Sequence, residues 1–321
     1  MVEALDEVIR EKVQASQKVL VTTHIRPDGD AIGSLLGLGI ALRQSGKAVQ
    51  MVSVDGVPAS YRHLPSSQDV LQHPDGRVDL TIVVDCSDLE RVGKSLDGYE
   101  VPDINIDHHV TNLQYANLNL IVPSAVATTE IIADRLPDWG LSLSPEVAAA
   151  LLTGLITDTL GFRTANMTPK AMRLAADLME AGAELPELYM RSLVLHSYEA
   201  MRFWGVGLSR LEREKAIVWT TLTMEDRQAV GYPGRDDADL INILSAINDA
   251  LISIIFVEQT KGNVKVSWRS RPGIDVSSVA LKFGGGGHPS AAGAELKGSL
   301  DEVREQVMSE TRRLVREEIT V

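Results

Sequence analysis

Short apolar runs alternate with longer helical patterns through the first half of the chain. We expect strands at Lys18–Thr22, Val49–Val54, Leu80–Val84, Asp103–Ile106 and, at a sheet edge, Tyr115–Ile121. We expect helices at Ala31–Arg43, Ala127–Arg135, Pro145–Thr157 and Pro169–Ala181. Ser144 and Thr168 each precede a proline, which is typical of a helix start. Strands that alternate with helices predict an α/β domain built on a parallel sheet.

The pattern changes character between residues 185 and 197. From there we expect helices at Pro186–Leu195, Tyr198–Arg213 and Asp239–Leu251, and strands at Ala216–Leu222, Ile252–Glu258 and Asn263–Arg269. The hairpin-like spacing of these strands predicts a smaller mixed sheet of about 110 residues, a usual size for one domain. We therefore predict a larger α/β domain over residues 1–190, a helical linker over residues 191–212 and a smaller α/β domain over residues 213–321.

Three polar residues that follow the first strand are the strongest sign of a functional site. His24, Asp28 and Asp30 lie within one stretch of seven residues, at the strand end where open α/β sheets place their sites. Pro27 and Gly29 force a tight turn that lets the two carboxylates converge. The alternative is an ordinary Asp-Gly surface turn that caps the next helix. A histidine and two aspartates directly after a strand favour function.

Further polar residues end later elements. Asp85 follows the hydrophobic strand Leu80–Val84, so a partner or a metal must satisfy its carboxylate unless it only caps a turn. Asp107, His108 and His109 end the fourth strand, where imidazoles supply nitrogen ligands and the carboxylate can orient one ring. Asp158 ends an apolar helix, where the helix dipole disfavours an anion and a nearby cation would offset the conflict. A frayed, solvated helix end is the alternative for Asp158.

These side chains should meet at one edge of the sheet and form a metal centre. The six candidate ligands are His24, Asp28, Asp30, Asp85, His108 and Asp158. Oxygen and imidazole ligands without thiolates suit Mn²⁺, Mg²⁺ or Fe²⁺ better than a structural zinc ion. Six ligands exceed what one catalytic ion with open positions needs, so we expect two ions. Paired ions clamp the attacking and leaving oxygens of a phosphoryl displacement, which predicts phosphoester hydrolysis.

Composition and charge restrict the partners and the location. The chain has 31 basic and 44 acidic residues, a formal net charge of −13, which argues against a duplex DNA track because that needs a broad basic surface. Metal ions can still supply positive charge locally to a small phosphorylated substrate. The single cysteine, Cys86, excludes an internal disulfide, and the apolar runs are too short to span a membrane. The first residues predict an amphipathic helix and not a signal peptide, so we expect a cytoplasmic protein.

Five motifs resemble those of the DHH phosphoesterase superfamily in their order and spacing. Four lie in the first domain: HIRPDGDAIGS, VVDCSD, IDHH and TGLITDTLGF. The fifth, GGGGHPSAAG at Gly284–Gly293, resembles the glycine-rich loop of the DHH-associated domain. The resemblance covers nearly the whole chain and is most similar to the nanoRNase/pAp phosphatase group, the bifunctional oligoribonucleases and PAP phosphatases. It implies a DHH catalytic domain, then a substrate-binding domain, with the active site in the cleft between them.

The resemblance also implies a role for each residue of the metal centre. One ion would be held by His24, Asp28 and Asp85. The other would be held by Asp30, Asp85, His108 and Asp158, so that Asp85 bridges the two. His109 would lie near the scissile phosphate, with Asp107 behind it. We accordingly predict His109, Asp85 and Asp107 as catalytic residues and two divalent cations, with Mn²⁺ ahead of Mg²⁺ or another divalent ion.

The second domain should recognise the substrate. The run Gly284–Gly287 can present backbone N–H groups to a phosphate, and His288 adds a donor. Within that run we predict contacts from Gly285, Gly286 and Gly287. A glycine run is usually only a flexible loop, but Pro289 and the small residues after it indicate the start of a helix, which would favour an anion.

Two arginines follow the strand NVKVSW, Arg269 and Arg271, and resemble family arginines near the terminal phosphate. Ordinary surface charge is the alternative for both. We predict that Arg269 contacts substrate and assign no role to Arg271.

The leading hypothesis is a hydrolase with exonuclease activity on short single-stranded RNA or DNA oligonucleotides (nanoRNA) and phosphatase activity on 3′-phosphoadenosine-5′-phosphate (pAp). It would use a two-metal hydroxide mechanism. A cyclic di-adenylate or pApA phosphodiesterase with the same site is the rival enzyme. A non-catalytic nucleotide-binding sensor is a hypothesis of a different class, which the loss of a ligand would have favoured, and every ligand is present. We also expect a homodimer formed through the larger domain.

Overall fold

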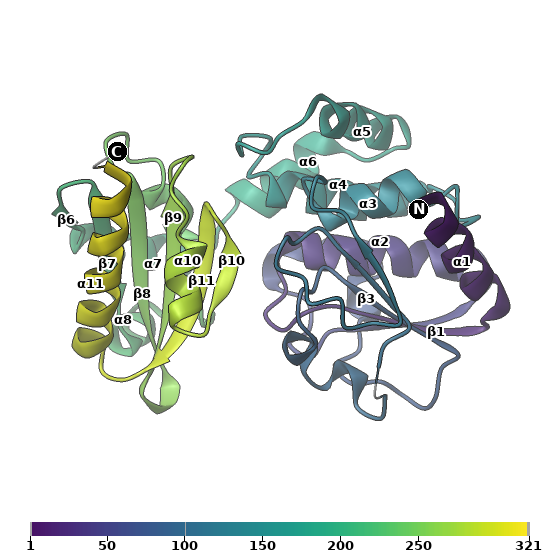
Figure 1. The fold of residues 1–321 in the computed structure, drawn as a ribbon, viewed down its shortest axis with the longest axis horizontal. Coiled ribbons are helices and arrows are strands. Elements are labelled where there is room, and N and C mark those ends of the chain that lie inside the picture. The colour runs from purple at the N-terminus through teal and green to yellow at the C-terminus, as the bar shows by residue number, and fades with distance from the viewer. Residues whose placement is uncertain (1, 100, 320–321) are drawn as a thin grey trace. The chain divides into compact units, whose positions relative to one another are not determined.

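A five-stranded sheet organises the first part of the computed structural model, which describes residues 2–99 and 101–319 (Figure 1). Its strands are β1 (Lys18–Thr22), β2 (Ala48–Val52), β3 (Leu80–Val84), β4 (Ile104–Asp107) and β5 (Leu118–Ile121). The strand order is β2-β1-β3-β4-β5, and every neighbouring pair is parallel. Successive side chains of a strand face opposite ways, so Val19 and Val21 enter the main core while Leu20 enters a smaller cluster. The predicted parallel sheet is confirmed.

Helices cover both faces of this sheet. The main core lies under α2 (Gly29–Gln44), α3 (Thr128–Arg135) and α4 (Pro145–Asp158). On the other face, Val92 and Leu96 of the 3₁₀ segment η3 (Leu89–Leu96) pack on Leu20. The remaining segments are α1 (Val2–Ala15), α5 (Pro169–Glu180), α6 (Leu185–Tyr189), the π-helical turn η4 (Met190–Val194) and the 3₁₀ turns η1 (Ala59–Tyr61) and η2 (Ser67–Asp69).

Two glycines allow α2 and α4 to pack very closely. A Cβ atom on Gly33 would lie 2.6 Å from the carbonyl oxygen of Ala150, and one on Gly29 would lie 2.1 Å from the hydroxyl oxygen of Thr157. Any side chain at either position would therefore push the helices apart. The close contact brings Asp158, the last residue of α4, beside the start of α2.

A mixed sheet organises the second part of the chain. Its strands are β6 (Glu212–Glu214), β7 (Ile217–Leu222), β8 (Ile252–Gln259), β9 (Asn263–Ser270), β10 (Gly286–His288) and β11 (Ala291–Lys297), in the order β10-β11-β9-β8-β7-β6. One face packs on α10 (Ser277–Lys282) and α11 (Leu300–Ile319). The other packs on α7 (Tyr198–Ser209), α8 (Met224–Val230) and α9 (Leu240–Leu244). A short 3₁₀ turn, η5 (Thr260–Gly262), joins β8 to β9. The predicted mixed sheet is confirmed.

Three details predicted for this second sheet are wrong. The helix expected at Asp239–Leu251 is reduced to α9, because serine, asparagine and aspartate after it favour turns over helix. The helix expected from Tyr198 ends at Ser209, and the residues after it form β6 against β7. The hairpin-like spacing holds only for β8 and β9, which are antiparallel. Strands β7 and β8 are parallel, and because a hairpin can join only antiparallel strands, they are joined through helices.

The chain divides into two compact units between Leu195 and His196. Helix α7, inside the predicted linker, packs in the second unit through Ala200 and Phe203. The predicted boundaries at residues 190 and 213, and an active site between the domains, stay predictions. Within the described residues, no helix has the length and apolar character that crossing a bilayer requires.

Candidate functional site

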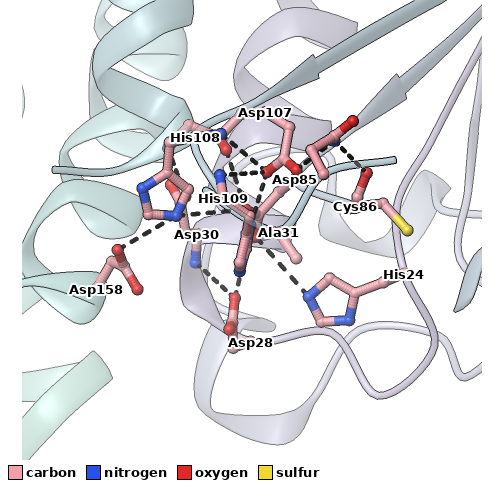
Figure 2. A network of polar contacts seen from close by, with 12 residues as sticks. His24, Asp28, Asp30, Ala31, Asp85, Cys86, Asp107, His108, His109 and Asp158 are labelled. Carbon is pink, nitrogen blue, oxygen red and sulfur yellow. Dashed lines mark hydrogen bonds and ion pairs between the residues drawn. The ribbon is translucent and has the colours of Figure 1, made fainter. Parts of the chain in front are cut away.

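The carboxyl ends of β1, β3 and β4 bring the candidate ligands of the first unit together (Figure 2). His24 follows β1, Asp85 follows β3, and Asp107 ends β4 before His108. Because the three strands are parallel neighbours, these residues emerge at one sheet edge, as the sequence predicted. The starts of α2 and α3 and the end of α4 close around them.

The turn between β1 and α2 fixes Asp28. Its Oδ1 accepts hydrogen bonds from the backbone N–H groups of Asp30 (3.1 Å) and Ala31 (3.0 Å), so Asp28 is the N-cap of α2. Desolvation alone would raise the pKa of Asp28, but His24 and the Ala31 amide together hold it below its usual range. The capping role therefore coexists with a position beside His24, and the two interpretations of this turn do not exclude each other.

The tautomer of His24 is set by the chain itself. Its Nδ1 lies 2.8 Å from the carbonyl oxygen of Ile25, which can only accept, so Nδ1 carries the proton. Nε2 then presents its lone pair toward Asp85, whose Oδ2 is 3.8 Å away. Burial lowers the pKa of His24 although the carboxylate of Asp28 opposes this, and the guanidinium of Arg91, 3.3 Å from Nδ1, lowers the pKa further. A neutral imidazole with Nε2 available is the form that binds a metal ion.

Asp85 lies at the centre of the cluster in a strained backbone conformation. Its φ is +53°, a left-handed value that directs the chain out of β3, and its N–H donates to the carbonyl oxygen of Ile106 (2.9 Å). The residue is 1% exposed. Burial, followed by the nearby carboxylates of Asp30 and Asp28, raises the pKa of Asp85 well above its usual range. A cation beside it would remove this conflict.

His108 faces three carboxylates. Its Nδ1 lies 3.3 Å from the carbonyl oxygen of Ala125, so the lone pair of Nε2 points the other way. Nε2 lies 3.8 Å from Oδ1 of Asp85, 4.0 Å from Oδ2 of Asp30 and 3.6 Å from Oδ2 of Asp158. Burial raises the pKa of Asp30, although His108 opposes this. Imidazole nitrogen and carboxylate oxygens at these spacings surround a common point.

His109 is held by a second carboxylate. Oδ1 of Asp107 accepts a hydrogen bond from Nδ1 of His109 (2.7 Å), and Asn112 Nδ2 donates to Oδ2 of Asp107 (2.6 Å). Burial opposes ionisation of Asp107, but these hydrogen bonds keep its pKa below its usual range. The side chain of His109 is 15% exposed against 3% for His108. His109 is therefore the more accessible of the two rings.

The donor set fits metal ions. We call His24, Asp28 and Asp85 the His24 group, and Asp30, Asp85, His108 and Asp158 the His108 group. Ligand atoms within 4.8 Å of one another come from all three members of the first group and from Asp30, Asp85 and His108 of the second. So many carboxylates in a buried cluster would repel without a cation between them. Asp85 faces the two groups with different oxygens, Oδ2 toward His24 and Oδ1 toward His108.

The substrate-binding residues predicted in the second unit share one edge of its sheet. Ala291 of β11 pairs with Arg269 of β9 on one side and with His288 of β10 on the other. Residues paired in this way project from the same face, so Arg269 and His288 flank a small alanine. Arg271 instead turns back to the chain, with Nη2 3.0 Å from the carbonyl oxygen of Ile247.

The glycine run does not begin a helix, and that expectation is wrong. Gly286 and Gly287 lie in β10 and pair with Gly293 and Ala292 of β11 in a hairpin. A Cβ on Gly287 would lie 2.4 Å from the carbonyl oxygen of Ala291, and its φ of +136° also favours glycine. A Cβ on Gly285 would lie 2.2 Å from the carbonyl oxygen of Gly293. The glycines therefore have a packing role in the hairpin, and their predicted phosphate contacts stay a prediction.

Four residues around the site were not singled out from the sequence: Arg91, Asn112, Thr128 and Thr129. Each contacts a predicted ligand or its partner, but none belongs to a strand-end cluster of ionisable groups. The sequence signal for Thr128 and Thr129 was a pair of threonines at a predicted helix start. Hydroxyls at such a position usually cap the helix, so the pair does not by itself indicate a site. Here the N-cap is Ala127, which makes no side-chain capping bond.

Comparison with known proteins identifies the family. Residues 18–155 match the DHH family, N-terminal domain, and residues 230–317 match the DHHA1 domain. The bifunctional oligoribonuclease and PAP phosphatase NrnA of Thermus thermophilus is 37% identical, over 94% of this chain and 90% of that protein. The chain belongs to the DHH phosphoesterase family. It is accordingly a phosphoester hydrolase, as predicted.

Solved structures agree on the fold. An exopolyphosphatase-related protein from Bacteroides fragilis superimposes with a TM-score of 0.86 at 24% identity and covers 98% of each chain. RecJ in complex with Mn²⁺, from Thermus thermophilus, superimposes with a TM-score of 0.51 at 15% identity, over 100% of this chain and 55% of RecJ. At these identities the likeness shows a shared fold and nothing further.

Proposed function

We propose that this DHH protein hydrolyses pAp and very short single-stranded oligonucleotides at a two-metal centre around Asp85. The observation that carries the proposal is the position of Asp85 between two ligand groups, 3.8 Å from Nε2 of His24 through Oδ2 and 3.8 Å from Nε2 of His108 through Oδ1. One carboxylate that faces two groups suits a pair of ions. The name of the relative from Thermus thermophilus, an oligoribonuclease and PAP phosphatase, supports the substrates.

The His24 group would hold one ion and the His108 group the other. Oxygen and imidazole donors without a thiolate suit Mn²⁺, Mg²⁺ or Fe²⁺, and the Mn²⁺ complex of RecJ supports Mn²⁺ among these. When bound, such a pair supplies an activated water and offsets negative charge on the phosphoryl oxygens. The carbonyl oxygens of Ile25 and Ala125 accept from Nδ1 of His24 and His108, so Nε2 of each ring faces the carboxylates.

His109 is proposed to contact the scissile phosphate. Asp107 accepts a hydrogen bond from Nδ1 of His109, which fixes the orientation of the ring. A protonated Nε2 would donate to a phosphoryl oxygen and offset the charge that develops there. The greater exposure of His109 than of His108 supports a substrate contact for His109 and a metal-ligand role for His108.

The second unit is proposed to bind the rest of the substrate. Arg269 and His288, on one face of its sheet, offer the donors that a terminal phosphate accepts. The formal net charge of −13 suits a substrate of a few nucleotides, because a long polyanion would be repelled by the remaining acidic surface. A location in the cytoplasm and a homodimer stay predictions.

A substrate panel at equal Mn²⁺ concentration tests this function. We expect hydrolysis of pAp to AMP and phosphate, release of mononucleotides from RNA of two to five nucleotides, and slow or no cleavage of a 24-nucleotide RNA. Cyclic di-adenylate cleaved faster than all linear substrates would favour the rival phosphodiesterase. Tight nucleotide binding without turnover of any substrate would indicate a sensor and contradict the proposal.

A further inference from the structure

The start of α3 donates three hydrogen bonds to the carboxylate of Asp30. The backbone N–H of Thr128 donates to Oδ2 of Asp30 (2.6 Å), and the N–H of Thr129 donates to Oδ1 (3.0 Å). The hydroxyl of Thr129 adds a third bond to Oδ1 (2.7 Å). These amides belong to the first turn of the helix, whose N-cap Ala127 leaves them without a side-chain partner of their own. The carboxylate of Asp30 therefore takes the place of a capping group.

The same turn contacts two more ligands. The hydroxyl of Thr128 donates to Oδ1 of Asp85 (3.0 Å), the oxygen that faces His108. The carbonyl oxygen of Ala125, just before the helix, accepts from Nδ1 of His108. Glu130 holds this segment in place, since its Oε2 accepts from the N–H of Val126 (2.8 Å). All these contacts are buried.

The described contacts of this turn all serve the His108 group. Asp30 and His108 belong to that group alone, and the bond to Asp85 is made to the oxygen that faces it. The members of the His24 group that are not shared are held by other segments. His24 is held by Ile25 of its own loop, and Asp28 by the first amides of α2.

We propose that Thr128 and Thr129 are positioning residues for the His108 group, and that they raise its affinity for a divalent cation without affecting the His24 group. This rests on the metal centre proposed above. The three donors to Asp30 occupy three of about four lone-pair positions of a carboxylate and leave one on Oδ2, the oxygen 4.0 Å from His108. A ligand already fixed in its binding orientation loses less conformational entropy when the ion binds. Partners of this kind are worth roughly 10- to 100-fold in metal affinity.

Direct Mn²⁺ binding to the full metal-free chain tests this, with free Mn²⁺ measured by electron paramagnetic resonance. The wild type should bind two ions. Thr129→Val removes one hydroxyl while it keeps the shape of the side chain. We expect it to lower the affinity for one of the two ions by roughly 10- to 100-fold. Asp28→Asn should lower the affinity for the other ion, and the variant that combines Asp28→Asn with Thr129→Val should lower both affinities.

Two variants control for folding and packing. Thr129→Ser keeps the hydroxyl and should bind both ions as the wild type does. Thr153→Val removes a buried hydroxyl that bonds only within α4, to the carbonyl oxygen of Ala149, and should leave both ions unchanged. Thr128→Val provides an independent test through Asp85.

The outcomes separate the inference from the function it depends on. If the wild type binds two ions, and Thr129→Val has either the same two affinities or both affinities lowered equally, the positioning role is refuted and the metal centre stands. If the wild type binds no Mn²⁺, the metal centre itself is refuted and the positioning role with it.

Discussion

The ring of His109 donates from Nδ1 to Oδ1 of Asp107 over 2.7 Å, and Asn112 donates to the other oxygen of the same carboxylate over 2.6 Å. Asp107 is thus held on both sides and fixes the tautomer and orientation of His109. Asn112 Nδ2 also lies 3.2 Å from the carbonyl oxygen of Cys86, the residue after the central Asp85. The chain between β4 and β5 is therefore tied to the end of β3 through one amide side chain.

Replacement of the Asp107 carboxylate should impair turnover more than binding. In Asp107→Asn, an amide replaces the charged acceptor of the His109 proton, so we expect kcat to fall roughly 10- to 100-fold while KM for pAp changes little. Steady-state kinetics with saturating Mn²⁺ measures both. Asp103→Asn, in the loop before β4, is the matched control, because Asp103 bonds to Thr81 at the far end of β3. Equal kcat losses in the two variants would contradict the role of Asp107.

The metal-free protein should be stabilised by loss of the charge on Asp85. Because the folded-state pKa of Asp85 is raised, its ionisation destabilises the fold as pH rises above the ordinary value of 3.8. Without metal, Asp85→Asn should therefore melt at a higher temperature than the wild type, by a margin that grows from about pH 4 toward neutrality. Saturating Mn²⁺ should reverse the order, since only the wild type gains from binding.

Thermal melts of both proteins at several pH values, with EDTA and then with Mn²⁺, measure this. An Asp85→Asn protein less stable than the wild type in EDTA at neutral pH would contradict the prediction that the ionised carboxylate of Asp85 destabilises the metal-free fold.

Gly33 should tolerate no side chain. The Cβ of Gly33→Ala would meet the carbonyl oxygen of Ala150 at 2.6 Å, a backbone atom that cannot move alone. We expect a loss of about 1–3 kcal/mol in the free energy of unfolding. Gly205→Ala, in α7 where nothing lies within 4 Å of the added atom, should instead gain about 0.5–1 kcal/mol from helix propensity. Calorimetry of both variants decides, and similar effects would contradict the close contact of α2 with α4.

Arg269 in β9 and Arg271 just after it should have different roles. Arg269→Ala removes a donor proposed for the terminal phosphate, so KM for pAp should rise roughly 10- to 100-fold, as for a lost charge-assisted hydrogen bond. Arg271 bonds to the carbonyl oxygens of Ile247 and Ala250, so Arg271→Ala should lower the melting temperature and leave KM nearly unchanged. An unchanged KM in Arg269→Ala would remove Arg269 from the substrate site.

Much of the first unit could be predicted from the sequence, because the mainly apolar strands β1 and β3 are followed within two residues by His24 and Asp85. Once the sheet is parallel, the ends of β1, β3 and β4 must meet, and His24, Asp85 and Asp107 come together without further information. The left-handed φ of Asp85 could not be predicted, since it follows from how β3 must leave the sheet and not from local composition.

The residues that support the ligands were harder to find. Thr128 and Thr129 follow an ordinary rule for helix starts, and only the tertiary structure turns them toward Asp30 and Asp85. The hairpin of β10 and β11 was missed because its glycines and alanines carry no periodic apolar signal. Close backbone contact at Gly287, and not chain flexibility, explains glycine there. The end of α9 was also missed, although the serine, asparagine and aspartate after it favour turns over helix.

Hydrolysis of pAp by the wild type and by Asp85→Asn, with Mn²⁺ present and phosphate release followed over time, tests the central claim most directly. We predict AMP and phosphate from the wild type, no product after chelation of the metal, and loss of turnover in Asp85→Asn by roughly a thousandfold or more, on the order of a lost group in a catalytic unit. Phosphate release by Asp85→Asn at the wild-type rate would contradict a metal centre built around that carboxylate.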